Sequence, residues 1–256
     1  MKHHILFLSI VLFNLTLWAQ DLKTSFISET LLEADTFFGV DTFDNTYYSK
    51  DNILYKKSPL KTFQFNSLAL GDISSVSITN PLEIVVFYKD FNTVIILDNT
   101  LNIIQKISFF DKTIGFVAKA DKNKLWLYNT DEQQLELYNY NTKTVIAKSQ
   151  PQSLSNPKEL KGNANFAWVK TASNTIKVFN SYASEIKTLN HTVNKFVISE
   201  ANTVVFEENK IFYLLDTIPH KINIDSTVPI ENIEVTNNKI YIFGANTIFM
   251  FTLLKN

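Results

Sequence analysis

A chain of 256 residues in which 45% are hydrophobic and only 19% charged can bury a large core, and its length suits one large all-β domain or two small ones. The 24 basic residues are all lysines and the formal net charge is -1, so a strong pull on nucleic acid and bidentate arginine recognition of phosphates are both excluded. The absence of cysteine excludes disulfides and lipid attachment through a cysteine.

The first twenty residues predict a secretory signal peptide. A short basic start is followed by an apolar stretch and then by the small residue Ala19. The alternative, a membrane-spanning signal anchor, is disfavoured because the apolar stretch is shorter than the roughly 20 residues that span a bilayer and Asn14 interrupts it. We therefore expect residues 1–20 to be removed, which leaves residues 21–256 as a single exported, periplasmic domain without a membrane span.

The next part of the chain is a series of short β-strands. Runs rich in Val, Ile, Phe and Tyr alternate with polar turns that contain Asn, Asp and Lys, and few stretches have helical periodicity. The runs form a repeated unit whose first strands recur at intervals of 36, 40, 44, 36 and 37 residues. Equivalent positions in these first strands are Val40, Val76, Phe116, Leu160, Phe196 and Ile233.

This period is about the length of a four-stranded β-propeller blade. The sequence therefore predicts an all-β propeller of six four-stranded blades, and the alternatives are seven smaller blades or two stacked sandwiches. The last unit ends after "NTIFMFT" without a fourth strand. We expect a strand from residues 22–32 to supply it and so to join the two ends of the chain, the alternative being a frayed leader.

The turns between the second and third strands carry most of the candidate interaction residues. In a propeller these turns share one face, around the mouth of the central channel, so the sequence predicts a polar, acid-leaning interaction face. The competing interpretation is that Asp, Asn and Glu are ordinary turn residues. The candidates are Asp51, Asp90, Asn92, Asp131, Glu132, Glu207 and Glu208, together with Tyr140, which we expect to be exposed in a third-to-fourth-strand turn.

The sequence contains no recognisable catalytic or metal motif. Beyond the signal peptide only His191 and His220 remain, and neither has a partner motif for nucleophilic catalysis or zinc binding. No glycine-rich nucleotide loop and no complete calcium loop is present. We predict no catalytic residue, no metal and no cofactor. Trp126 and Trp168 lie inside strands and are expected to pack between sheets.

The segment "GDISSVSITNPLEIVVFYKDFNTVIILDNTLN", residues 71 to 102, resembles small exported propeller-like proteins of Bacteroidota and, beyond them, periplasmic accessory proteins of the type IX secretion translocon. The resemblance implies a non-enzymatic scaffold that binds a protein partner in an outer-membrane complex, and it carries over no functional residues. The alternatives are a glycan-active enzyme and a small-ligand-binding propeller, both using the acidic turns.

Overall fold

The computed structural model describes residues 21–151, 154, 156–190, 193–199, 202–207, 210–215, 218–224 and 227–254, with the backbone alone for residues 202–207 and 215. The predicted signal peptide lies outside these residues, as do His191 and Glu208. Within the described part of the chain, no helix is both long and apolar enough to cross a membrane.

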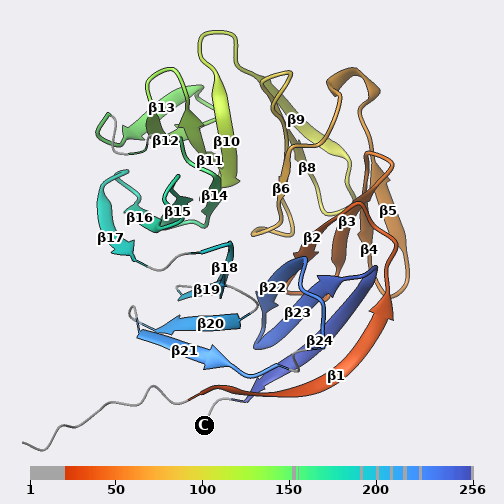
Figure 1. Ribbon diagram of the computed structural model, residues 1–256. Coiled ribbons are helices and arrows are strands. Elements are labelled where there is room, and N and C mark those ends of the chain that lie inside the picture. Colours follow the sequence, from red (N-terminus) through yellow and green to blue (C-terminus); the bar gives the residue numbers. More distant parts are fainter. Residues whose placement is uncertain are drawn as a thin grey trace, which may run out of the picture.

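The chain folds into six four-stranded antiparallel sheets arranged as blades around a central axis (Figure 1). The prediction of an all-β propeller is confirmed, and the sheet order gives six blades of four strands rather than seven smaller ones. From the first sheet to the sixth, the strands are β2 (Thr36–Val40), β3 (Thr46–Lys50), β4 (Ile53–Lys57) and β5 (Thr62–Phe65); β6 (Ser75–Ser77), β7 (Ile84–Tyr88), β8 (Thr93–Leu97) and β9 (Ile103–Ser108); β10 (Ile114–Lys119), β11 (Lys124–Asn129), β12 (Gln134–Asn139) and β13 (Thr144–Lys148); β14 (Glu159–Gly162), β15 (Phe166–Lys170), β16 (Ile176–Asn180) and β17 (Glu185–Leu189); β18 (Lys195–Ser199), β19 (Asn202–Glu207), β20 (Lys210–Leu215) and β21 (Ile218–Ile222); and β22 (Asn232–Thr236), β23 (Lys239–Gly244), β24 (Thr247–Leu254) and β1 (Lys23–Leu31).

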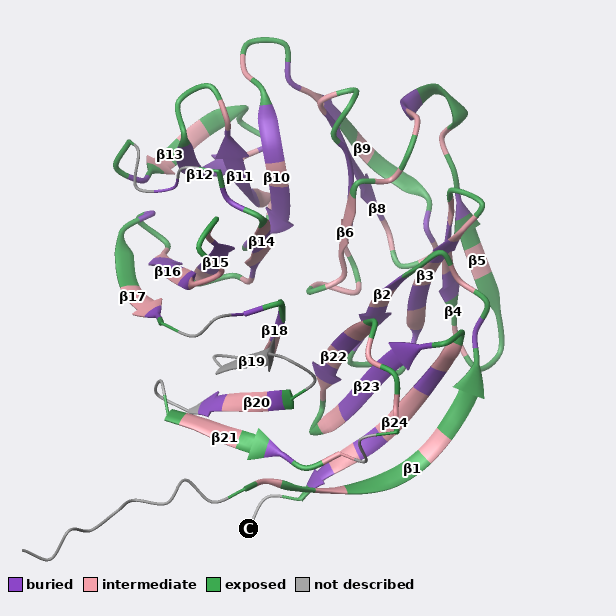
Figure 2. Cartoon of the chain, in the orientation of Figure 1, coloured by how far each residue is buried: buried purple, intermediate pink, exposed green. Residues whose placement is uncertain are grey.

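The hydrophobic pattern of each strand matches its place in the blade. All five residues of β7 and all five of β8 are buried, as expected of strands that other blades cover on both faces. The fourth strands lie on the outside of the ring and are largely exposed, as in β13, where exposed and half-buried residues alternate (Figure 2). The first strands lie innermost and contact one another around the axis.

The core consists of apolar side chains that pack between neighbouring blades. One cluster joins Val85 and Phe87 of β7 to Leu125 and Leu127 of β11, and the other clusters repeat this arrangement around the ring. Trp126 and Trp168 are both buried within such clusters, so the prediction that they pack between sheets is confirmed. Burial of each such side chain contributes on the order of 1.5–3 kcal/mol.

The N-terminal strand completes the sixth sheet. β1 runs antiparallel to β24, from Lys23 opposite Leu254 to Leu31 opposite Thr247, with a bulge between Phe26 and Ser28. This pairing is the one that the missing fourth strand of the last repeat predicts, and the alternative of a frayed leader is wrong. Both ends of the described chain are thus held in one sheet, and β24 presents no open edge to solvent.

A disulfide across this closure tests it directly. Ser25 and Thr252 are Cα partners in the β1–β24 ladder, and the Cα atoms of directly opposed residues in an antiparallel pair lie within the range that a disulfide requires. We expect Ser25→Cys combined with Thr252→Cys to form an intramolecular disulfide that stabilises the oxidised protein by about 2 to 4 kcal/mol, because it closes a long loop. Urea unfolding of the same variant with and without reductant measures the difference. If the monomeric variant keeps two free thiols under oxidising conditions, the pairing is contradicted.

Candidate functional site

One face of the propeller carries the turns that the sequence marks as candidates, and five of the six lie in the described part of the chain. Because strands within each sheet are antiparallel, the turns between second and third strands emerge at the same end as the connections between sheets. We call this the turn face. Asp51, Asp90, Asn92, Asp131 and Glu132 all lie on it, whereas Glu208 and the side chain of Glu207 lie outside the described residues. The predicted residues are spread over several blades instead of converging on one centre.

An asparagine in a left-handed conformation joins several of these turns to the following connection. The φ angles of Asn52, Asn92, Asn174 and Asn246 lie between 46° and 60°. The carbonyl oxygens of the last three accept hydrogen bonds from the backbone N–H groups of Phe109 (3.1 Å), Val193 (2.9 Å) and Leu32 (2.8 Å). Asparagine tolerates this conformation better than most residues, so its recurrence in these turns has a structural cause.

Asn92 also uses its side chain to hold the connection to the third blade. Its Nδ2 donates to the carbonyl oxygens of Phe109 (2.8 Å) and Lys112 (2.6 Å), and its Oδ1 accepts from the N–H of Ile114 (2.9 Å). All hydrogen-bonding groups of the amide except one lone pair are therefore occupied. Asn92 is on the predicted face, but its side chain positions a loop and is not available to a ligand.

The acidic candidates have similar positioning contacts. Asp131 accepts a hydrogen bond from the N–H of Thr113 (2.7 Å), and Glu132 forms an ion pair with Lys148 (2.6 Å). Asp51 uses its backbone N–H to bind the carboxylate of Asp35 (2.7 Å). Among the residues that the structure describes, no three His, Asp or Glu side chains form a group that could hold a metal ion. Among the candidate acids, the carboxylate of Asp131 thus holds a neighbouring connection, and that of Glu132 pairs with a strand of its own blade.

The prediction for Tyr140 is wrong, because its side chain is only 3% exposed and lies in the core between the second and third blades. The third-to-fourth-strand turn folds back over the first-to-second-strand turn, with the N–H of Tyr140 bound to the carbonyl of Asn123 (3.0 Å). Its hydroxyl donates to Glu83 (3.4 Å), and Lys119 lies 5.7 Å from the ring centroid. Burial raises the pKa of Tyr140 to about 12. Tyr140 therefore links two blades and cannot contact a partner.

The turn face carries exposed apolar side chains that the sequence reading missed. Leu68, Phe91 and Phe110 are 95%, 53% and 96% exposed, and we call them the apolar ridge. The ring of Phe91 lies against Gly71, 3.3 Å from the position of a Cβ there, while its neighbour Asn92 binds the backbone of Phe109. The second-blade turn therefore lies between the connections that carry Leu68 and Phe110. For Phe91 and Phe110, an aromatic residue beside Asp in a predicted loop was the available signal.

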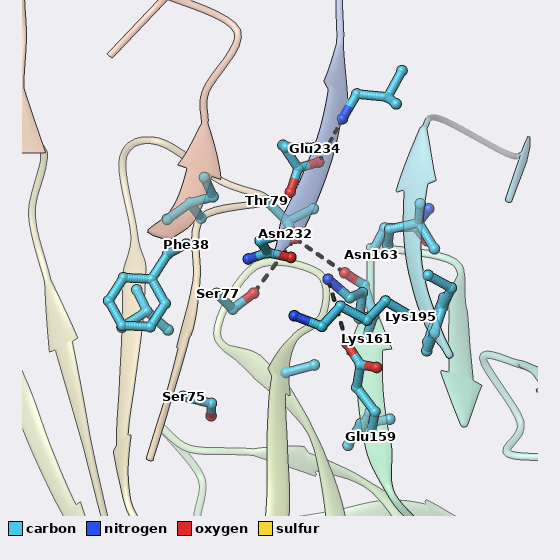
Figure 3. Close-up of a pocket in the computed structure, with 18 of the residues that line it drawn as sticks. Phe38, Ser75, Ser77, Thr79, Glu159, Lys161, Asn163, Lys195, Asn232 and Glu234 are labelled. Carbon is cyan, nitrogen blue, oxygen red and sulfur yellow. Dashed lines mark hydrogen bonds and ion pairs between the residues drawn. The ribbon is translucent and has the colours of Figure 1, made fainter. Parts of the chain in front are cut away.

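The second prominent feature is the central channel. A cavity of about 700 Å³ lies between the six first strands. Its charged lining includes Glu159 and Lys161 of β14, Lys195 of β18 and Glu234 of β22, and Figure 3 shows these side chains around the cavity. Glu159 and Lys161 form an ion pair of 3.6 Å. At the end of the channel away from the turn face, Thr79 Oγ1 donates to the carbonyl of Gly162 (3.2 Å) and joins the second blade to the fourth.

Comparisons with known proteins identify the fold class only. The chain matches no family model and no curated protein. Among solved structures it is similar to the WD40 domain of Pan2 from Neurospora crassa (10% identity, TM-score 0.60, 87% of this chain and 76% of that chain). It is also similar to the WD40 propeller domain of Doa1 (12%, 0.56, 92% and 94%) and to virginiamycin B lyase from Staphylococcus aureus (13%, 0.59, 91% and 100%). These neighbours establish a β-propeller, a fold that supports binding domains and enzymes alike.

The structural role of Asn92 leads to a stability prediction. Replacement by Ala removes three hydrogen bonds, leaves the backbone groups of the connection without partners, and places Ala at a φ of 46°. We expect Asn92→Ala to lower the free energy of unfolding by about 2 to 4 kcal/mol in urea titrations with an unchanged m-value. Asp90→Ala, in the same turn and exposed, is the matched control and should change it by less than about 0.5 kcal/mol. Equal effects of the two would argue against the loop-holding role.

Proposed function

We propose that this propeller is a non-enzymatic binding protein whose turn face contacts a protein partner. The observation that carries the proposal is the apolar ridge of Leu68, Phe91 and Phe110. Exposed aromatic and aliphatic side chains on adjacent loops of a rigid scaffold are the usual anchors of protein interfaces. Their exposure has no packing benefit in the isolated chain, whereas burial in a partner would remove them from water.

The positions of the acids support binding over catalysis. A glycan-cleaving site needs two carboxylates at a defined separation around the scissile bond. Asp131 and Glu132 lie in one turn and are engaged by Thr113 and Lys148, respectively. Asp90 lies in the turn of another blade, where it is exposed next to the apolar ridge. Such charges are suited to the polar rim of an interface around an apolar centre.

The cellular setting of the proposal comes from the sequence. The predicted signal peptide supports a periplasmic location, and the resemblance of residues 71–102 supports an accessory subunit of an outer-membrane complex of the type IX secretion kind. The domain would lie peripherally against that complex and bind neither nucleic acid nor lipid directly. A few anchor residues carry most of the binding energy of a protein interface, so substitutions within the ridge are informative.

Substitutions on the two faces of the propeller test the proposal. We expect Leu68→Ser combined with Phe110→Ser to reduce capture of a defined partner from solubilised outer membranes by roughly tenfold or more, because both anchors are lost. Leu60→Ser is the matched control, since Leu60 is 99% exposed in the turn between β4 and β5 on the opposite face. Thermal unfolding should be the same for all three proteins.

Retention of the partner by the ridge variant, or its loss in Leu60→Ser, would place the interface elsewhere. Glycan cleavage by the purified protein, abolished by Asp90→Ala or Asp131→Ala, would overturn the non-enzymatic proposal.

A further inference from the structure

We propose that the central channel binds a small zwitterionic ligand of the size of an amino acid or short peptide, with its ammonium group on Glu234 and its carboxylate on Lys161. The site is separate from the turn-face interface, and neither proposal depends on the other. It rests on the volume of the cavity, on the opposite charges that face it, and on a backbone feature that makes room for Glu234.

The size and lining of the cavity suit such a ligand. Its volume of about 700 Å³ lies within the usual range of small-molecule sites. The lining combines the aromatic rings of Phe38 and Phe116 with the hydroxyl groups of Ser75 and Ser77. Figure 3 shows that Phe38, Ser75 and Ser77 lie on one side of the cavity and the charged residues of β14 lie on the other. An apolar side chain of the ligand could therefore pack against one side of the cavity, and the polar backbone of the ligand could contact the other.

The carboxylate of Glu234 lies in a space that Gly39 provides. Gly39 has a φ of +137°, at a bulge in β2, and a Cβ at this position would lie 2.9 Å from Glu234 Oε2. Only glycine combines this backbone conformation with the close approach of the carboxylate. The local backbone of the first blade is therefore shaped around an acidic side chain of the sixth.

Glu234 has no cationic partner among the residues that the structure describes. Its Oε1 accepts a hydrogen bond from the N–H of Val235 (3.1 Å), and no lysine forms an ion pair with it. Burial raises the pKa of Glu234 to about 7, the positive charge of Lys161 acts to lower it, and Glu159 acts to raise it. A half-buried carboxylate without a counterion is costly, and a ligand ammonium group would supply the missing charge.

Lys161 can supply the complementary cation. Its ammonium lies 3.6 Å from Glu159, beyond ordinary hydrogen-bond length, and 5.8 Å from the ring centroid of Phe196. Lys195, by contrast, donates to the backbone carbonyl of Glu231. Lys161 is thus held loosely at the cavity wall, where a ligand carboxylate can pair with it.

The remaining charged groups around the channel do not change this assignment. Lys158 is exposed directly before β14, and after β2 the carboxylate of Asp41 accepts hydrogen bonds from Asn45 and Tyr47. The described cavity linings of β6 and β10 contribute hydroxyl and apolar side chains. A purely anionic ligand would be repelled by Glu159 and Glu234, and a neutral sugar would leave Glu234 without a counterion. A ligand that carries both charges can pair with Glu234 and with Lys161 at the same time.

Proton release provides a specific signature of this binding mode. In the free protein the carboxyl group of Glu234 is largely protonated below its pKa of about 7. A ligand ammonium favours the ionised carboxylate, so binding lowers that pKa and releases a proton when the pH is near or below 7. Affinity for a dipeptide should therefore rise as the pH increases toward about 7 and fall again as the ligand ammonium loses its proton at a pH of about 8.

The test uses isothermal titration calorimetry of the purified protein with L-alanyl-L-phenylalanine and with the free L-amino acids. We expect at least one of these probes to bind, with proton release at pH 6.5 visible as a dependence of the heat on the buffer. The N-acetylated and amidated forms of the same probe should bind roughly 10- to 100-fold more weakly, because each lacks one of the two charges. This comparison needs no variant protein.

Matched substitutions then assign the contacts. Glu234→Gln should weaken binding by a similar factor and abolish proton release, and Lys161→Met should remove the preference for the free carboxylate over the amide. Lys106→Met, on the outer strand β9, is the control and should leave binding unchanged. The proposal is overturned if none of the probes binds, if capped and uncapped forms bind equally, or if maltose binds instead and is insensitive to Glu234→Gln.

Discussion

Packing between neighbouring blades is the interaction on which this structure depends. The middle strands of each sheet, such as β7 and β8, are apolar on both faces, so no blade can bury its residues without a neighbour on either side. A row of such sheets would leave two apolar faces at its ends, and only a closed ring removes both. The pairing of β1 with β24 fastens that ring, because it binds the start of the described chain to its last strand.

The same closure explains why function must lie at the ends of the blades and along the axis. Core side chains fill the interfaces between blades. In an outer strand such as β13, exposed and half-buried residues simply alternate. On the turn face, Asn92 and the equivalent asparagines hold the connections, so the backbone there is rigid while Leu68 and Phe110 project from it. Along the axis, the six first strands cannot meet in one point, and their spacing leaves the channel. A rigid ring thus provides two chemically different surfaces.

The sequence predicted the features that depend on repetition. It did not predict the exposure or the role of a residue where these depend on a single tertiary contact. The period of the first strands is repeated around the whole chain, so it identifies the propeller and the missing fourth strand. Tyr140 shows the limit, since a polar turn sequence does not reveal that the turn folds back to bury its aromatic ring. Asn92 was placed on the correct face, but its bonds to residues about twenty positions away are invisible in the sequence. Glu234 was missed because a single acid in a short inner strand matches no motif.

The bulge at Gly39 is the clearest place where the chain departs from what stability alone favours. Regular pairing of β2 with β3 is interrupted between Phe37 and Gly39, in the innermost strand of the first blade. The space that results is occupied by the Glu234 carboxylate, which lacks a cationic partner and whose pKa is raised by burial. An apolar residue in place of Glu234 would cost less desolvation. Deviations of this kind are concentrated at functional sites, because packing requires neither the interrupted strand pairing nor the half-buried carboxylate without a counterion.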